Sequence, residues 1–121
     1  MKGKRSRRYL AAVGAVALLL AAPPPAHAFV SRGARLVDLM REYEKSQAGS
    51  KDVLWGNLGR FEGYVVGVCD SLDSSLALPD GTSQEHVVAA VAKYLQNHPE
   101  RWDLPAFDLV KLALFESFPR R

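Results

Sequence analysis

Residues 54–76 read LWGNLGRFEGYVVGVCDSLDSSL, and this stretch decides the fold of the chain. Its apolar residues recur at steps of three and four, the spacing that places side chains on one face of an α-helix. We predict a helix over about residues 52–76, around which the rest of the domain packs. Its apolar face consists of Leu54, Leu58, Phe61, Val65, Val68 and Leu72.

A second row of small residues runs along the same predicted helix. Gly59, Gly63 and Gly67 step by four, and they fall on the side opposite the apolar face. We call these three residues the glycine row. A glycine inside a helix costs about 1 kcal/mol relative to alanine, so three of them in register predict that a second backbone crosses close by, from this chain or from a second copy. A bulky residue at Gly63 is then expected to unfold the domain or to split a dimer.

The first 28 residues have the three parts of a secretory signal peptide. Basic residues crowd positions 2–8, an apolar run covers positions 10–22, and Ala26-His27-Ala28 supplies the small residues of a cleavage site. The run is shorter than the ~18 residues that a membrane-spanning helix needs, and three prolines follow it. We therefore predict a cleaved peptide rather than a lasting anchor. Ser6-Arg7-Arg8 also resembles a twin-arginine signal, which leaves two export routes open.

Removal of this peptide reverses the sign of the net charge. The whole chain carries 16 basic and 13 acidic residues, for a net charge of +3. Five of the basic residues lie in positions 2–8, so 11 basic and 13 acidic residues remain after cleavage, a net charge of −2. No basic patch is left to favour nucleic acid or an anionic membrane surface as a partner.

Cysteine and histidine are too few for a disulfide or a metal centre. Cys69 is the only cysteine, which excludes an intramolecular disulfide, and we interpret it as a small buried residue. His86 and His98 are the only histidines after the signal peptide, and no cluster of ligands surrounds either of them. We expect no metal and no cofactor.

Three other helices complete an all-α domain over residues 29–121. Leu36, Leu39, Met40 and Tyr43 indicate an amphipathic helix over residues 32–48. Residues 78–81 have turn composition, and Thr82 followed by Glu85 is a capping-box signature for a helix that ends before Pro99. A last helix starts at about Pro105. Its predicted buried side consists of Phe107, Leu109, Val110, Leu112, Ala113, Leu114 and Phe118.

No set of residues has the spacing of a catalytic site. Asp70 and Asp73 share one helix face, and we interpret them as solvated acids near a helix end. The glycines lie inside a helix rather than at its start, where a phosphate-binding loop would need them. The sequence thus points away from an enzyme and towards an exported helical domain that binds another molecule.

A series of short motifs occurs in order along residues 61–119. They are Phe61-x-Gly63-Tyr64-Val65-x-Gly67-Val68-x-Asp70, Leu78-Pro79, Val87-Val88, Tyr94-Leu95-x-x-His98-Pro99-Glu100, Pro105-Ala106, Leu109-Val110, Ala113-Leu114 and Phe118-Pro119. In this series the chain resembles the Rap/Tai family of type VI secretion amidase immunity proteins. The resemblance implies a small all-α periplasmic protein, often dimeric, that binds and blocks a peptidoglycan amidase injected by neighbouring cells.

The chain departs from the family pattern at the cysteines. Family members commonly carry one cysteine before the Leu-Pro motif and another after the Phe-Pro motif, positioned to form a disulfide. Here these positions are Ala77 and Arg120. A further cysteine often precedes the glycine-tyrosine pair, where this chain has Phe61 and Glu62.

The leading hypothesis is an inhibitor that occludes the cleft of a cell-wall amidase with an exposed loop. The candidate contact residues are Asp80 and Gly81 in one loop, and Glu100, Arg101 and Trp102 in the other. Tryptophan and arginine are frequent interface anchors, although Trp102 could equally fill the core beside the last helix. The alternatives are a periplasmic chaperone of the acid-stress type and an adaptor subunit of an envelope complex.

Overall fold

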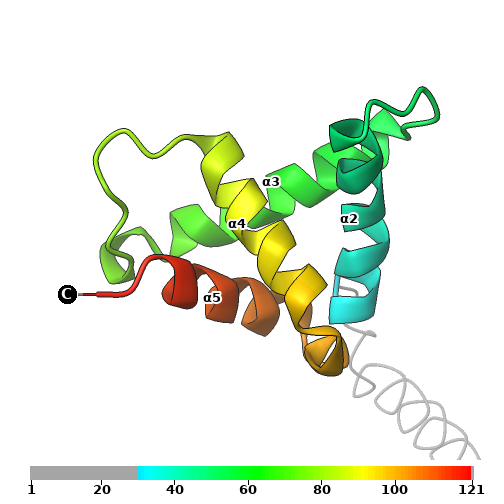
Figure 1. Ribbon diagram of the computed structural model, residues 1–121. Coiled ribbons are helices and arrows are strands. Elements are labelled where there is room, and N and C mark those ends of the chain that lie inside the picture. The colour runs from blue at the N-terminus through cyan, green and yellow to red at the C-terminus, as the bar shows by residue number, and fades with distance from the viewer. Residues whose placement is uncertain (1–29, 121) are drawn as a thin grey trace, which may run out of the picture.

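The computed structural model describes residues 30–120, which form an all-α domain of four helices (Figure 1). These are α2 (Gly33–Gln47), α3 (Trp55–Ser71), α4 (Gln84–Asn97) and α5 (Ala106–Ser117). Two short 3₁₀ turns lie between them, η1 (Asp73–Ser75) and η2 (Pro99–Arg101). The predicted signal peptide lies outside the described residues. Within those residues, no helix is long and apolar enough to cross a membrane.

The predicted central helix, α3, packs against each of the other three helices. Phe61 and Val65 are completely buried, and Val68 and Cys69 nearly so, which confirms the apolar face and the interpretation of Cys69. Helix α5 shares this central position, because Leu109, Val110, Ala113 and Leu114 are all fully buried. The prediction that one helix organises the domain was therefore correct but incomplete.

The structure shortens α3 at both ends. Leu54 caps the helix and is 58% exposed, so it does not belong to the buried face. The helix ends at Ser71, whose hydroxyl donates a hydrogen bond of 2.7 Å to the Val68 carbonyl. Serine and aspartate compete in this way with helical backbone bonds, and the segment after Ser71 is rich in both.

Two further predictions of detail were wrong. Phe107 and Leu112 are 42% and 41% exposed, because the buried stripe of α5 follows Ala106, Leu109, Val110, Ala113 and Leu114. The cap of α4 is Ser83 rather than Thr82, since the Ser83 hydroxyl accepts from the His86 N–H at 3.1 Å. The Thr82 hydroxyl instead donates to the Pro79 carbonyl at 2.6 Å, within the predicted turn.

The glycine row is not covered by another part of this chain. A Cβ added at Gly59, Gly63 or Gly67 would meet no atom within 4 Å among the described residues. The row lies on the solvent face of α3, so the prediction of two-sided burial is wrong within one chain. Packing of a second copy against this face stays a prediction.

A second backbone does approach a glycine closely, but at Gly33, the first residue of α2, rather than at the glycine row. The Gly33 N–H donates to the Leu104 carbonyl at 2.8 Å, and the Ala106 N–H donates to the Ser31 carbonyl at 3.1 Å. A Cβ at Gly33 would lie 2.6 Å from the Trp102 carbonyl oxygen. We call residues 31–33 and 104–106 the backbone clasp. It holds the start of α2 against the start of α5.

Glu42 on α2 is the buried charged residue that fixes the loop between α2 and α3. Its carboxylate accepts from the Leu54 N–H at 2.8 Å and from the Lys45 ammonium at 2.9 Å, while its own exposure is 5%. These bonds, first that of Leu54 and then that of Lys45, hold the pKa of Glu42 below its ordinary value. The carboxylate thus replaces a side-chain cap that α3 lacks.

We expect Glu42→Gln to lower the thermal midpoint at pH 7 and to reduce the sensitivity of the fold to acid. A lowered pKa in the folded state contributes stability above the unfolded pKa, near 4.5, and this contribution is lost as pH falls through the folded pKa. Thermal midpoints between pH 3 and 7 should therefore converge at the acidic end. Glu44→Gln is the matched control, because the Glu44 carboxylate meets only the exposed Arg41, at 3.3 Å. Parallel profiles for Glu42→Gln and wild type would contradict this role.

Candidate partner-binding surface

The two predicted contact loops lie at opposite ends of α4 (Figure 1). Asp80 and Gly81 form the exposed turn before α4, where Gly81 has a φ of 81° and so uses the freedom of glycine. Glu100 and Arg101 lie in η2, directly after α4. With 14 residues, α4 separates the loops by about 20 Å. The structure therefore offers two candidate surfaces rather than one.

The loop after α4 is a rigid element, and we call residues 98–104 the α4–α5 corner. Trp102 is half-buried, packs against the core, and donates from its indole nitrogen to the Leu95 carbonyl at 2.8 Å. The guanidinium of Arg41 lies 5.7 Å from the centroid of the same ring. Trp102 thus anchors the corner from inside, which favours the core-filling alternative for much of its side chain.

Polar side chains from α4, the corner and α5 meet at the outer side of the corner. The rings of Tyr94 and His98 lie 4.3 Å apart, centroid to centroid. His98 Nδ1 donates to the Glu100 carboxylate at 2.9 Å, and its Nε2 lies 4.0 Å from the Glu116 carboxylate. Arg101 contacts the Tyr94 hydroxyl, with its guanidinium 5.9 Å from that ring's centroid. Sequence reasoning chose Glu100 and Arg101 but missed Tyr94, His98 and Glu116.

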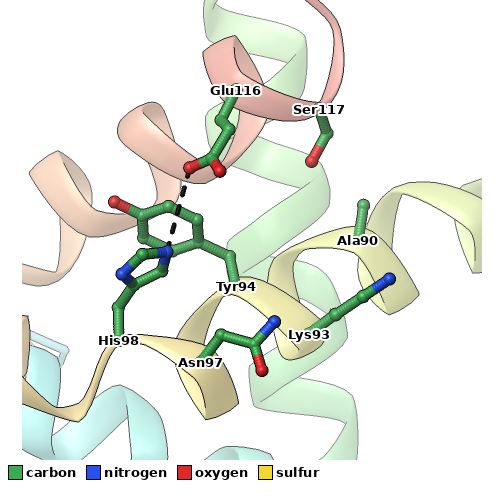
Figure 2. Close-up of a pocket in the computed structure, with 7 residues that line it drawn as sticks. All are labelled: Ala90, Lys93, Tyr94, Asn97, His98, Glu116 and Ser117. Atoms are coloured by element: carbon green, nitrogen blue, oxygen red, sulfur yellow. Dashed lines mark ion pairs between the residues drawn. The ribbon is translucent and has the colours of Figure 1, made fainter.

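Of these side chains, Tyr94, His98 and Glu116 border an open pocket of about 250 Å³ (Figure 2). Figure 2 shows Glu116 of α5 facing His98, which directly follows α4, with Tyr94 beside the imidazole. The hydrogen bond from His98 is the main cause that holds the pKa of Glu100 below its ordinary value. Glu100 is therefore ionised at neutral pH, and the corner presents its charge next to the positive charge of Arg101.

The arrangement provides binding contacts rather than reactive groups. Among residues 30–120, no three His, Cys, Asp or Glu side chains gather where they could hold a metal ion. Burial raises the pKa of the Cys69 thiol, with smaller contributions from Asp70 and Asp73, so the nucleophilic thiolate is disfavoured. The described residues thus form a small all-α domain whose loops carry exposed charged side chains.

The sequence of this domain matches the model of a known protein family. A sequence model of the Rap1a immunity proteins matches residues 33–119, from the start of α2 to the end of the last helix. The chain belongs to the Rap1a immunity protein family, which confirms the resemblance to the Rap/Tai immunity proteins. No curated protein and no solved structure matches the chain. Membership of this family implies that the protein binds a cognate secreted effector.

Proposed function

We propose that this protein is a periplasmic immunity protein that binds and blocks a peptidoglycan amidase delivered by a type VI secretion system. The observation that carries this proposal is the family match, which covers nearly the whole described domain. The signal-like segment over residues 1–28 supports export to the periplasm, by either of the two routes. A homodimer belongs to the same proposal.

The inhibitory element that we propose is the α4–α5 corner, with Glu100 and Arg101 as its contact residues and Trp102 as its anchor. The hydrogen bonds that hold this loop in place include Trp102 Nε1 to Leu95, Gly33 N to Leu104, and Leu104 N to Arg101. A loop that is already ordered loses little conformational entropy on binding. The Asp80–Gly81 turn has fewer bonds to hold it, and we propose it as a peripheral contact.

The test pairs the purified chain from residue 29 onward with amidases encoded by adjacent genes. Calorimetry would measure the affinity, and release of peptides from peptidoglycan would measure inhibition. We expect Glu100→Lys to weaken binding by tenfold or more, about 1.4 kcal/mol, because it reverses the charge beside Arg101 and removes the carboxylate that the His98 ring contacts. Asp80→Lys tests the other loop with the same charge change at the far end of α4, and we expect it to weaken binding less, because that turn is proposed only as a peripheral contact.

The two variants distinguish a wrong choice of contact loop from a wrong proposed function. Full binding by Glu100→Lys together with lost binding by Asp80→Lys would transfer the inhibitory role to the other loop. Absence of binding to any co-encoded amidase would contradict the proposed function itself. The chaperone alternative predicts that the protein prevents aggregation of other proteins at low pH, yet its usual intramolecular disulfide cannot form with Cys69 alone.

A further inference from the structure

A groove of about 520 Å³ lies between α2 and α3, on a side of the domain that the α4–α5 corner does not line. Arg35 and Leu39 come from α2, and Arg60, Gly63 and Tyr64 come from α3. Val30 closes the groove ahead of α2. The absence of a side chain at Gly63 leaves the α3 backbone accessible, because a Cβ there would meet only open space. We call this feature the arginine groove.

The two arginines of the groove have no ion-pair partner among the described residues. Within residues 30–120, neither the Arg35 nor the Arg60 guanidinium lies within 4.0 Å of a carboxylate. By contrast, Arg41, Lys45 and Arg101 each have such a partner. Two like charges that border one groove repel each other, and an anion bound between them would relieve this cost.

The other residues that line the groove indicate which kind of anion would bind there. Val30 and Leu39 supply apolar surface beside the guanidinium groups. Burial, and then the nearby Asp108, raises the pKa of Tyr64, so its hydroxyl remains a hydrogen-bond donor. A guanidinium matches a carboxylate in a bidentate geometry. An acidic side chain that adjoins an apolar side chain therefore matches the groove in both charge and surface.

We propose that the arginine groove is a second docking site, which binds a segment of the partner protein where acidic and apolar residues alternate. The proposal rests on the proposed function for the presence of a protein partner. The partner would contact the corner through one surface and the groove through another, and two linked contacts bind more tightly than either alone. The groove would then contribute affinity and orientation, while the corner would contribute inhibition.

The test uses two synthetic probes, the acetylated amidated peptide LELELEL and its analogue LQLQLQL. We expect the acidic probe to shift NMR signals of the arginine side chains and the Gly63 amide, with an affinity that falls at high salt. The glutamine probe should bind at least tenfold more weakly. Arg35→Gln/Arg60→Gln should lose binding of the acidic probe at least tenfold. The matched control is Lys51→Gln/Lys111→Gln, which removes the same charge from exposed positions outside the groove.

Three results of the peptide and sedimentation experiments would overturn the proposal. Equal binding of both probes would show that charge complementarity does not contribute to binding. Undiminished binding of the acidic probe by the double arginine variant would show that the binding site lies elsewhere. A wild-type dimer that the same variant converts to a monomer in sedimentation equilibrium would make a second copy the occupant.

The amidase assay keeps this proposal distinct from the proposed function. If the arginine variant still inhibits the amidase as wild type does, only the groove proposal fails. If wild type binds the acidic probe but inhibits no amidase, only the proposed function fails.

Discussion

Gly33→Ala is expected to destabilise the domain by about 2–3 kcal/mol and to lower its thermal midpoint by roughly 10–20 °C. The added methyl carbon would lie 2.3 Å from Leu109 Cδ1, 2.6 Å from the Trp102 carbonyl oxygen and 3.0 Å from the Leu104 carbonyl oxygen. Two of these atoms belong to the backbone, and Leu109 is fully buried, so none can move without disturbing its neighbours. The start of α2 would have to leave the corner.

The measurement is thermal and urea unfolding of the purified domain. Gly56→Ala is the control, because Gly56 lies in the first turn of α3 and a Cβ there would meet nothing within 4 Å. The control should be as stable as wild type or more so. Unchanged stability of Gly33→Ala would show that the contact at Gly33 is looser than the structure indicates. Since the corner carries the proposed inhibitory residues, affinity for the partner should fall along with stability.

The triple variant Gly59→Ala/Gly63→Ala/Gly67→Ala is expected to act in the opposite direction. Alanine restricts the unfolded chain and favours the helix by about 0.5–1 kcal/mol at each such position. No atom within 4 Å opposes the new methyl groups. The isolated domain should gain about 2 kcal/mol and about 10 °C in its thermal midpoint. A loss of stability would show that the exposed face of α3 is covered in solution.

The same triple variant tests what the glycine row does. If a second copy packs its backbone against the row, sedimentation equilibrium will show a dimer for wild type and a monomer for the variant. If the row contacts the effector, the variant will be more stable and yet will inhibit less. A variant that is more stable, unchanged in association and fully inhibitory would show that the row serves neither contact. Residues retained for binding often lower the stability of a protein in this way.

Local sequence patterns predicted the structural features that depend on residues close together in the sequence. The spacing of Phe61, Val65 and Val68 was sufficient to place the buried face of α3 and the burial of Cys69 beside it. Proline and glycine marked the helix ends to within a few residues. The buried face of α5 was predicted correctly except at Phe107 and Leu112, because an apolar sequence there fits two adjacent stripes and only tertiary contacts decide between them.

Features that depend on residues distant in the sequence could not be predicted in this way. Gly33 carries no local signal, since its constraint comes from carbonyl groups near position 104. The glycine row gave a strong signal, but no other described part of the same chain covers it. Spacing shows which residues share a face and not whether anything covers that face. Glu100 and Arg101 were chosen as exposed loop residues, whereas the contacts of His98 with Glu116 required the packing of α4 against α5.

The backbone clasp also constrains the order in which the domain can fold. It joins the first helix of the described residues to the start of the last one, through hydrogen bonds between Gly33 and Leu104 and between Ser31 and Ala106. Closure of so long a loop is slow and entropically costly, and it requires that Ala106 has already been synthesised. A chain cut before that residue would keep the sequence of α2 but have nowhere to fix its first turn. The first turn of α2 is thus secured only once the start of α5 is present.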